Sequence, residues 1–343
     1  MQCVLVTGNL GYIGSVLTPL LVKEGYDVTG FDAGFFADAH FTRREKVSFT
    51  QIIKDIRKVE ASDVQGFDAI IHLAALSDDP QEGLGKELML AINFEATVRL
   101  ARLAKEAGVK RFLFSSSCSV YGSGEGEKFV DEHSPLKPIS TYAVSKVKSE
   151  EALAHMASDT FCPVLLRNAT CYGISPRMRF DLVLNNLVGH AFTTGEIKIL
   201  SDGTPWRPLV HIEDVARAFI ALLKANAGRV CGQAFNVGQT KENYQIKELA
   251  AIIARHIPNT SINLLNTAGP DKRSYRVSCD KIAAIKEFEP QWSAERYVPL
   301  LYATLKQMNF SAKDFENNEY YTLAFYRHLG ETKKITRDLY AIT

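Results

Sequence analysis

The chain has 343 residues, of which 46% are hydrophobic and 23% charged, and its formal net charge is +1. This is the composition of a globular protein, long enough for one large domain or two smaller ones. The near-neutral charge gives no support for a nucleic-acid or membrane-surface partner, and no apolar run is long enough to span a bilayer. A strand beginning at Cys3 or Val4 leaves no room for a signal peptide. Six scattered cysteines, without a Cys-x-x-Cys pair, indicate a reduced cytoplasmic protein, and we expect no metal site.

The segment from Val4 to Asp32 predicts a strand, a glycine-rich turn, a helix and a second strand. Val4, Leu5 and Val6 form a short apolar run that is typical of a strand buried on both faces. Apolar residues then recur at helical spacing until Gly25, and a second apolar strand ends at Asp32. Between the first strand and the helix, glycines stand at every third position: Gly8, Gly11 and Gly14.

Each glycine of this turn has a separate task in a dinucleotide site. Gly8 permits the tight turn, Gly11 lets backbone N–H groups approach a pyrophosphate, and Gly14 lets the helix pack close to the strand. The helix N-terminus then faces the anion with unpaired donors and a partial positive charge. Asp32 can accept hydrogen bonds from the adenosine ribose and would repel a 2′-phosphate, which favours NAD over NADP.

Further strands and helices alternate along the first half of the chain. Short connections between them predict a parallel, doubly wound α/β sheet of the Rossmann type. We expect the long helix 88–107 to carry Asn93 as a solvated polar residue. The predicted strands are 47–53, 67–73, 111–115 and 163–167, and the predicted helices are 88–107 and 141–157.

After residue 173 this alternation is interrupted by segments rich in glycine, proline and arginine. Three such segments are 173–179, 202–208 and 269–276. We expect residues 1–173 to form the dinucleotide-binding domain, to which residues from about 205 to 240 return. Residues 174–310 are expected to form mainly a smaller substrate-binding lobe over the carboxyl ends of the strands. Residues 311–343 are expected to form a helical, aromatic tail whose role the sequence does not indicate.

Tyr142 and Lys146 are four residues apart and therefore share one face of a helix. A tyrosine hydroxyl, with an ordinary pKa of about 10, is a poor base at neutral pH. A neighbouring ammonium and a nicotinamide cation both favour the phenolate. Ser117, at the end of the strand that begins at Arg111, can hydrogen-bond the same substrate oxygen. The three residues can therefore move a proton on or off a carbinol while NAD takes or returns a hydride.

The spacing Thr7-Gly8-x-x-Gly11-x-x-Gly14, together with Ser117 and the Tyr142/Lys146 pair, resembles the extended short-chain dehydrogenase/reductase superfamily. The resemblance covers roughly residues 1–299 and is strongest to the nucleotide-sugar epimerases and dehydratases. It implies that Ser117, Tyr142 and Lys146 form the catalytic triad, and that the helices 88–107 and 141–157 form a homodimer interface. It also implies a set of NAD contacts besides Tyr142 and Lys146: Gly8, Gly11, Tyr12, Ile13, Gly14, Asp32, Asp55, Ile56, Leu73, Ala74 and Ala75.

The same resemblance implies a nucleotide-diphosphate sugar as the substrate. Arg207, before the stretch PLVHIEDVA, corresponds to an arginine that holds the nucleotide half, and Arg273 falls in a segment that supplies a further diphosphate contact. Where the family often has Asn, this chain has Thr170, and Asn185 or Asn186 could supply the missing contact. The expected substrate-binding residues are therefore Ser117, Thr170, Arg177, Asn185, Arg207 and Arg273, with Arg179 as a further candidate.

The two residues after Ser117 limit the reaction. Dehydratases of the resembled family place Asp and Glu there, and 3,5-epimerases place a Cys at the second position, whereas this chain has Cys118 and Ser119. Strand alternation would turn Cys118 away from Ser117 and Ser119. The remaining chemistry is oxidation or reduction at C4, most simply by a nucleotide-sugar 4-epimerase. A nucleotide-sugar 4-dehydrogenase or 4-ketoreductase, with a heptose among the sugars it could act on, is the alternative, and a non-catalytic NAD-binding scaffold or sensor is the remote one.

Overall fold

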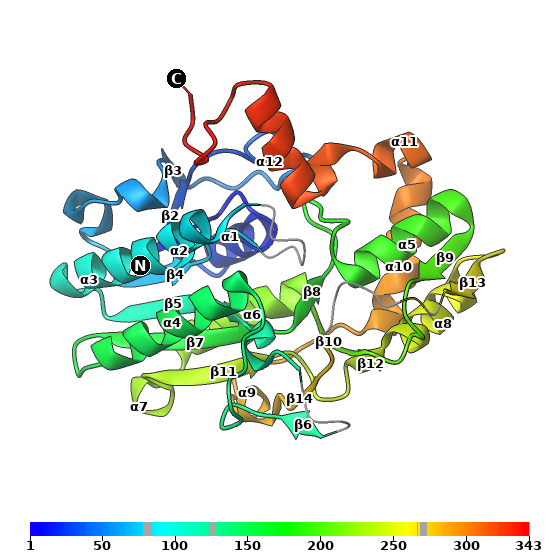
Figure 1. The fold of residues 1–343 in the computed structure, drawn as a ribbon. Coiled ribbons are helices and arrows are strands. Elements are labelled where there is room, and N and C mark those ends of the chain that lie inside the picture. Colours follow the sequence, from blue (N-terminus) through cyan, green and yellow to red (C-terminus); the bar gives the residue numbers. More distant parts are fainter. Residues whose placement is uncertain (78–83, 124–127, 266, 268–272, 343) are drawn as a thin grey trace.

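A computed structural model describes residues 1–77, 84–123, 128–265, 267 and 273–342 of the chain. Within these residues the largest sheet is entirely parallel, with the strand order β11-β7-β5-β4-β1-β2-β3 (Figure 1). The predicted α/β class is confirmed. The strands of this sheet are β1 Cys3–Thr7, β2 Asp27–Asp32, β3 Thr50–Ile53, β4 Ala69–His72, β5 Arg111–Ser117, β7 Cys162–Asn168 and β11 Gln233–Val237.

Helices cover both faces of the large sheet because its strands are apolar on both faces. Val4 and Val6 point into a core formed with α1 (Gly14–Lys23) and α6 (Ile212–Lys224). Leu5, between them, points to the opposite face, as the two-residue period of a strand requires. That face is covered by α2 Lys86–Leu90, the π-helical segment η3 Ala91–Glu95, α3 Ala96–Glu106 and α4 Thr141–Met156.

The predicted helix 88–107 is interrupted by η3, and the prediction that Asn93 is solvated is wrong. Asn93 is 1% exposed. Its Oδ1 accepts from Leu76 N at 2.8 Å, and its Nδ2 donates to Leu76 O at 3.0 Å and Ser145 Oγ at 3.3 Å. The Asn93 side chain therefore connects the segment after β4 to α4. Single π-helical turns within α-helices are frequent at functional sites. Strand β3 is also shorter than predicted, since residues 47–49 are not part of it.

The second lobe is built from small sheets and longer helices beside the carboxyl ends of the large sheet (Figure 1). Its main core is formed by α5 (Val183–Thr194), α8 (Ile246–His256) and α10 (Ala294–Gln307). The smaller sheets are β12-β10-β8, β13-β9 and β14-β6. Their strands are β6 Phe129–Val130, β8 Thr170–Tyr172, β9 Glu196–Ile199, β10 Trp206–His211, β12 Asn243–Gln245, β13 Ser261–Leu264 and β14 Arg276–Val277. Outside this lobe, short helical segments pack near the large sheet: η1 Ile56–Lys58, η2 Ala61–Val64, η4 Cys118–Tyr121, α7 Ala227–Val230 and α9 Asp280–Ala283.

The carboxyl-terminal tail contains α11 (Ala312–Phe315), η5 (Asn318–Tyr320) and α12 (Thr322–Glu331). It begins against the second lobe, where α11 packs on α5. It then crosses to the dinucleotide side of the molecule (Figure 1), where the ring of Phe325 stacks on Phe36 at a centroid distance of 5.1 Å. The tail therefore contacts both halves of the chain. Among the described residues, we find no helix with the length and apolar character needed to cross a membrane.

Candidate active site

A cavity of about 650 Å³ opens at the carboxyl ends of the strands of the large sheet, between the two lobes. Open α/β sheets bind their ligands at this edge. Of the residues predicted to form the site, only Lys146 and Asn185 are not part of the cavity wall. Those that line it are Gly8, Gly11, Tyr12, Ile13, Gly14, Asp32, Asp55, Ile56, Leu73, Ala74, Ala75, Ser117, Tyr142, Thr170, Arg177, Arg207 and Arg273.

At Gly8 and Gly14 of the glycine turn, the backbone approaches other backbone atoms so closely that no side chain would fit. Gly8 has φ +72°, and a Cβ added there would lie 2.6 Å from Ala74 N. A Cβ on Gly14 would lie 2.3 Å from Gly8 O, so these glycines are required by close backbone contacts. Helix α1 begins at Gly14 without a side-chain cap, and its partial positive charge faces the turn, where it favours an anion. This cradle fits the pyrophosphate of a dinucleotide.

Asp32 ends β2 beside this turn. Its carboxylate accepts hydrogen bonds from Leu10 N at 3.1 Å and Gly34 N at 2.8 Å, and burial raises its pKa. Arg44, distant in sequence, lies within electrostatic range of this carboxylate while donating to Ser15 Oγ and Phe36 O. The structure thus places a guanidinium near Asp32 that inspection of the neighbouring sequence does not predict.

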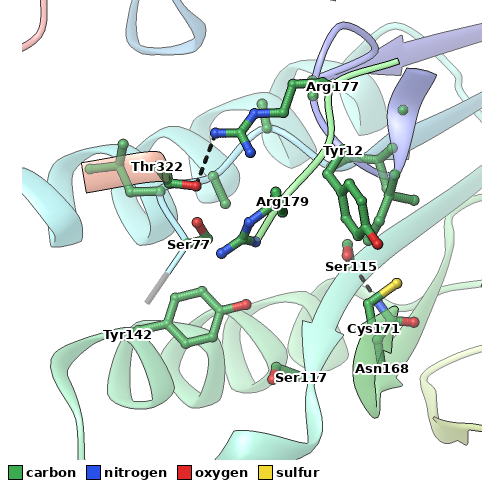
Figure 2. Close-up of a pocket in the computed structure, with 18 of the residues that line it drawn as sticks. Tyr12, Ser77, Ser115, Ser117, Tyr142, Asn168, Cys171, Arg177, Arg179 and Thr322 are labelled. Atoms are coloured by element: carbon green, nitrogen blue, oxygen red, sulfur yellow. Dashed lines mark hydrogen bonds between the residues drawn. The ribbon is translucent and has the colours of Figure 1, made fainter. Parts of the chain in front are cut away.

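Ser117, Tyr142 and Lys146 meet where β5 ends and α4 begins. Ser140 Oγ caps α4 by accepting from Ala143 N, which places Tyr142 in the first turn. Figure 2 shows the Tyr142 ring and Ser117 on the same side of the cavity. Lys146 lies behind this wall, with its Nζ 5.5 Å from the centroid of the Tyr142 ring, and Nζ donates to the Ser115 carbonyl at 2.7 Å. Because Lys146 is fully buried, its pKa falls to about 7.

A buried ion pair behind the triad was not predicted from the sequence. Glu150, one helical turn after Lys146, pairs with Arg167 of β7 at 2.7 Å, and the Ser116 hydroxyl donates to the same carboxylate. The negative charge of Glu150 acts to raise the pKa of Lys146, against the larger effect of burial. The pair therefore fixes α4 against β5 and β7. The four-residue spacing from Lys146 to Glu150 places both side chains on one face of α4, and it is the sequence feature that indicates their contact.

Two buried oxygens in the cavity wall have no hydrogen-bond partner among the described residues. They are Ser119 Oγ and Asn168 Oδ1. A buried polar atom normally has a partner, and the sequence did not predict that these two would have none. Cys118, in contrast, is buried away from the cavity, and its thiol donates to Arg167 O at 3.1 Å.

Asn185, a predicted substrate contact, does not line the cavity in the structure. Asn185 is fully buried, and its amide already bonds Tyr297 Oη, Arg179 O and Tyr12 Oη. Its neighbour Asn186 lines the cavity instead. The alternative that the sequence left open is therefore the one that the geometry favours.

The predicted arginines differ in how far their side chains are already used. Arg177 lines the cavity, but its guanidinium lies 4.2 Å from the centroid of the Phe36 ring and donates to Thr322 Oγ1 at 3.0 Å (Figure 2). Arg179 projects toward Tyr142 in the same view and forms a two-point ion pair with Asp181. Arg207 and Arg273 lie next to each other, because the Arg207 guanidinium donates to the Arg273 carbonyl.

The fold and this site define an NAD-dependent enzyme of the extended short-chain dehydrogenase/reductase type. The profile of the NAD dependent epimerase/dehydratase family matches residues 4–238. The chain belongs to this family.

Several known proteins resemble most of the chain. It is 31% identical over 263 residues to an uncharacterised UDP-glucose epimerase, YtcB of Bacillus subtilis, covering 73% of this chain and 80% of that protein. It is 28% identical over 307 residues to UDP-glucuronate 4-epimerase of Thermodesulfobacterium geofontis, covering 85% and 92% of the two chains. The UDP-glucuronic acid 4-epimerase of Bacillus cereus, solved with UDP-glucuronic acid and NAD, has a TM-score of 0.73 and 26% identity, covering 90% of this chain and 100% of that one.

Proposed function

We propose that the protein is an NAD-dependent nucleotide-sugar 4-epimerase. The observation that carries this proposal is the wall formed by Ser117 and Tyr142, with Lys146 behind it and no carboxylate at the two positions after Ser117. The relatives named above as 4-epimerases support the choice of reaction. NAD, when bound, would accept a hydride from C4 of the sugar and later return it.

The chain's own residues would handle the proton and the orientation of the sugar. Tyr142 would remove the proton from the C4 hydroxyl and give it back, while Ser117 holds the same oxygen. An ammonium on Lys146 would favour the phenolate form of Tyr142. Lys146 is buried and Tyr142 half-buried, so the two groups interact more strongly than they would at an exposed surface.

The positions after Ser117 argue against elimination or proton removal at carbon. Burial raises the pKa of the Cys118 thiol well above its ordinary value, so it would not form a thiolate near neutral pH. Ser119 faces the cavity but has no useful acidity. Inversion at C4 needs neither residue as an acid or base, because the 4-keto sugar only has to turn over before it is reduced.

The diphosphate of the substrate would be held by Arg207 and Arg273, which both line the cavity, because a guanidinium group suits a phosphate. Thr170 and Asn186, on the same cavity wall, would contact the sugar or its phosphate. Arg179, which is paired with Asp181, has no assigned role in substrate binding, and its side chain projects toward Tyr142 (Figure 2).

The test is to incubate the purified protein with a panel of UDP- and other nucleotide sugars. Epimerisation converts substrate into its C4 epimer, seen by NMR, without net accumulation of reduced nicotinamide. A 4-dehydrogenase would instead consume added NAD and raise the reduced-nicotinamide absorbance, and a 4-ketoreductase would consume the reduced form. If no sugar nucleotide is converted although NAD binds, the scaffold alternative replaces the proposal.

Asp32 should set the choice between NAD and NADP. We expect Asp32→Ala to weaken NAD binding and to reduce the preference for NAD over NADP. The carboxylate that repels the 2′-phosphate is lost, while Arg44 stays nearby. Binding of both cofactors, measured by titration calorimetry, checks this. The matched control is Asp32→Ala with Arg44→Ala, which should bind NADP more weakly than Asp32→Ala alone. Equal affinity of the wild type for NAD and NADP would refute the role of Asp32.

We also propose that the protein is a cytoplasmic homodimer. All six cysteine thiols are free, which fits a reducing compartment. Phe94 of η3, Val98 of α3 and Val144 of α4 are half-buried apolar residues, which a second copy could cover. Light scattering at micromolar concentration should give the dimer mass, and Val98→Arg should shift it toward the monomer. A monomeric wild type would remove the proposal.

A further inference from the structure

The carboxyl-terminal tail ends in a tight loop that belongs to the cavity wall. Ile335 and Ala341 form an antiparallel bridge, and Thr336 N donates to Tyr340 O at 2.8 Å. Leu339 lies at the closed end of this loop. It is 4% exposed and lines the cavity, as do Asp55 and Ile56.

Leu339 adopts an unusual backbone conformation to reach this position. Its φ is +56°, in the left-handed region where a bulky side chain without glycine's freedom is strained. Strain of this kind persists where the surrounding structure imposes it, and it is concentrated at binding sites. The neighbouring loop residues Thr336, Arg337 and Asp338 have exposed side chains, so Leu339 is the residue that the loop presents to the cavity.

Arg57 attaches this loop to the dinucleotide side. Its guanidinium donates to the carbonyls of Asp338 at 2.8 Å and Leu339 at 3.2 Å, and it lies 3.6 Å from the centroid of the Tyr340 ring. The same guanidinium forms a two-point ion pair with Asp55, with Nη2 2.5 Å from Oδ2. Arg57 thus joins the terminal loop to Asp55 and Ile56, two of the expected NAD contacts, which the family resemblance places at the adenine.

We propose that the terminal loop, residues 335–341, forms one wall of the adenine subsite and must move away before NAD can leave. Leu339 supplies the apolar contact, and Arg57 is the positioning residue that holds the loop in place. The inference rests on the assignment of this cavity to NAD but not on which sugar is converted. It gives the tail a role that lies outside the segment matched by the family profile, residues 4–238.

The primary test compares NAD release from the wild type with release from Leu339→Gly. Glycine tolerates positive φ, so this change relieves backbone strain while it removes the side chain. Leu339 is already buried against the protein before NAD binds, so loss of its side chain should favour opening of the loop by about 10- to 100-fold. We expect NAD release, followed by stopped-flow displacement, to accelerate by that order. Asp338→Ala is the matched control, because only its backbone carbonyl is used, and it should release NAD at the wild-type rate.

Limited proteolysis provides a readout that does not depend on affinity. Lys334 and Arg337 are exposed, and trypsin can cut there only when the loop loosens. NAD should slow this cleavage in the wild type. Arg57→Lys, which keeps the charge but loses the guanidinium contacts, should be cut faster and release NAD faster, with a melting temperature close to that of the wild type.

The outcomes separate this proposal from the proposed function. If the wild type does not bind NAD, the assignment of the cavity itself fails. If NAD binds tightly, but neither Leu339→Gly nor Arg57→Lys changes its release and NAD does not slow cleavage at Lys334 or Arg337, then the cavity assignment stands and the role of the loop is overturned.

Discussion

Replacing Tyr142 by phenylalanine should lower turnover by about 10²–10⁴-fold, the usual contribution of general acid–base catalysis. The ring would keep its place in the first turn of α4, and only the hydroxyl that carries the proton would be lost. NAD binding should change little, because the glycine turn and Asp32 are untouched. Turnover with the identified sugar nucleotide and the Kd of NAD, measured on the same preparation, check both statements.

Ser119→Ala is the informative comparison for this variant. Ser119 also lines the cavity, and its Oγ has no partner among the described residues, but we assign it no proton transfer at carbon. Its loss should therefore cost much less than that of the Tyr142 hydroxyl. A loss as large as that of Tyr142→Phe would exclude chemistry confined to C4, and an unaffected Tyr142→Phe enzyme would exclude the triad.

The sequence predicts those parts of the site that depend on local backbone form. The glycine turn, Asp32 and the four-residue spacing of Tyr142 and Lys146 each follow from a short segment whose structure has a period or a turn requirement. Their positions at one edge of the sheet follow from parallel topology, since the carboxyl ends of all strands lie together. These residues come together in the structure as expected, with Lys146 behind the wall instead of within it.

The parts that could not be predicted depend on contacts between distant segments. Asn93 is buried because a π-helical turn directs its amide to Leu76 and Ser145, and helix propensity carries no such information. Asn185 and Asn186 are equivalent by composition, and only the packing of α5 decides which of them reaches the cavity. The terminal loop has no local pattern linking it to Arg57, which is more than two hundred residues earlier in the chain.

Lys146→Met should combine a large loss of activity with a gain in folded stability. Activity should fall by about 10²–10⁴-fold, as for Tyr142→Phe, and NAD should bind more weakly if the lysine also holds the nicotinamide ribose. Stability should rise near neutral pH, because methionine fills similar space without the cost of burying an ammonium. Urea unfolding of the NAD-free protein measures this second effect.

The pH dependence of unfolding identifies the lysine as the cause. Lys146 has a pKa of about 7 in the folded protein, below the value of about 10.4 expected in the unfolded chain. Between these values the unfolded state binds more protons, so the free energy of unfolding of the wild type rises with pH. Relative to Lys146→Met, the wild type should gain about 1.4 kcal/mol per pH unit between about pH 7.5 and 9. A constant difference over this range would mean that Lys146 keeps an ordinary pKa despite its burial.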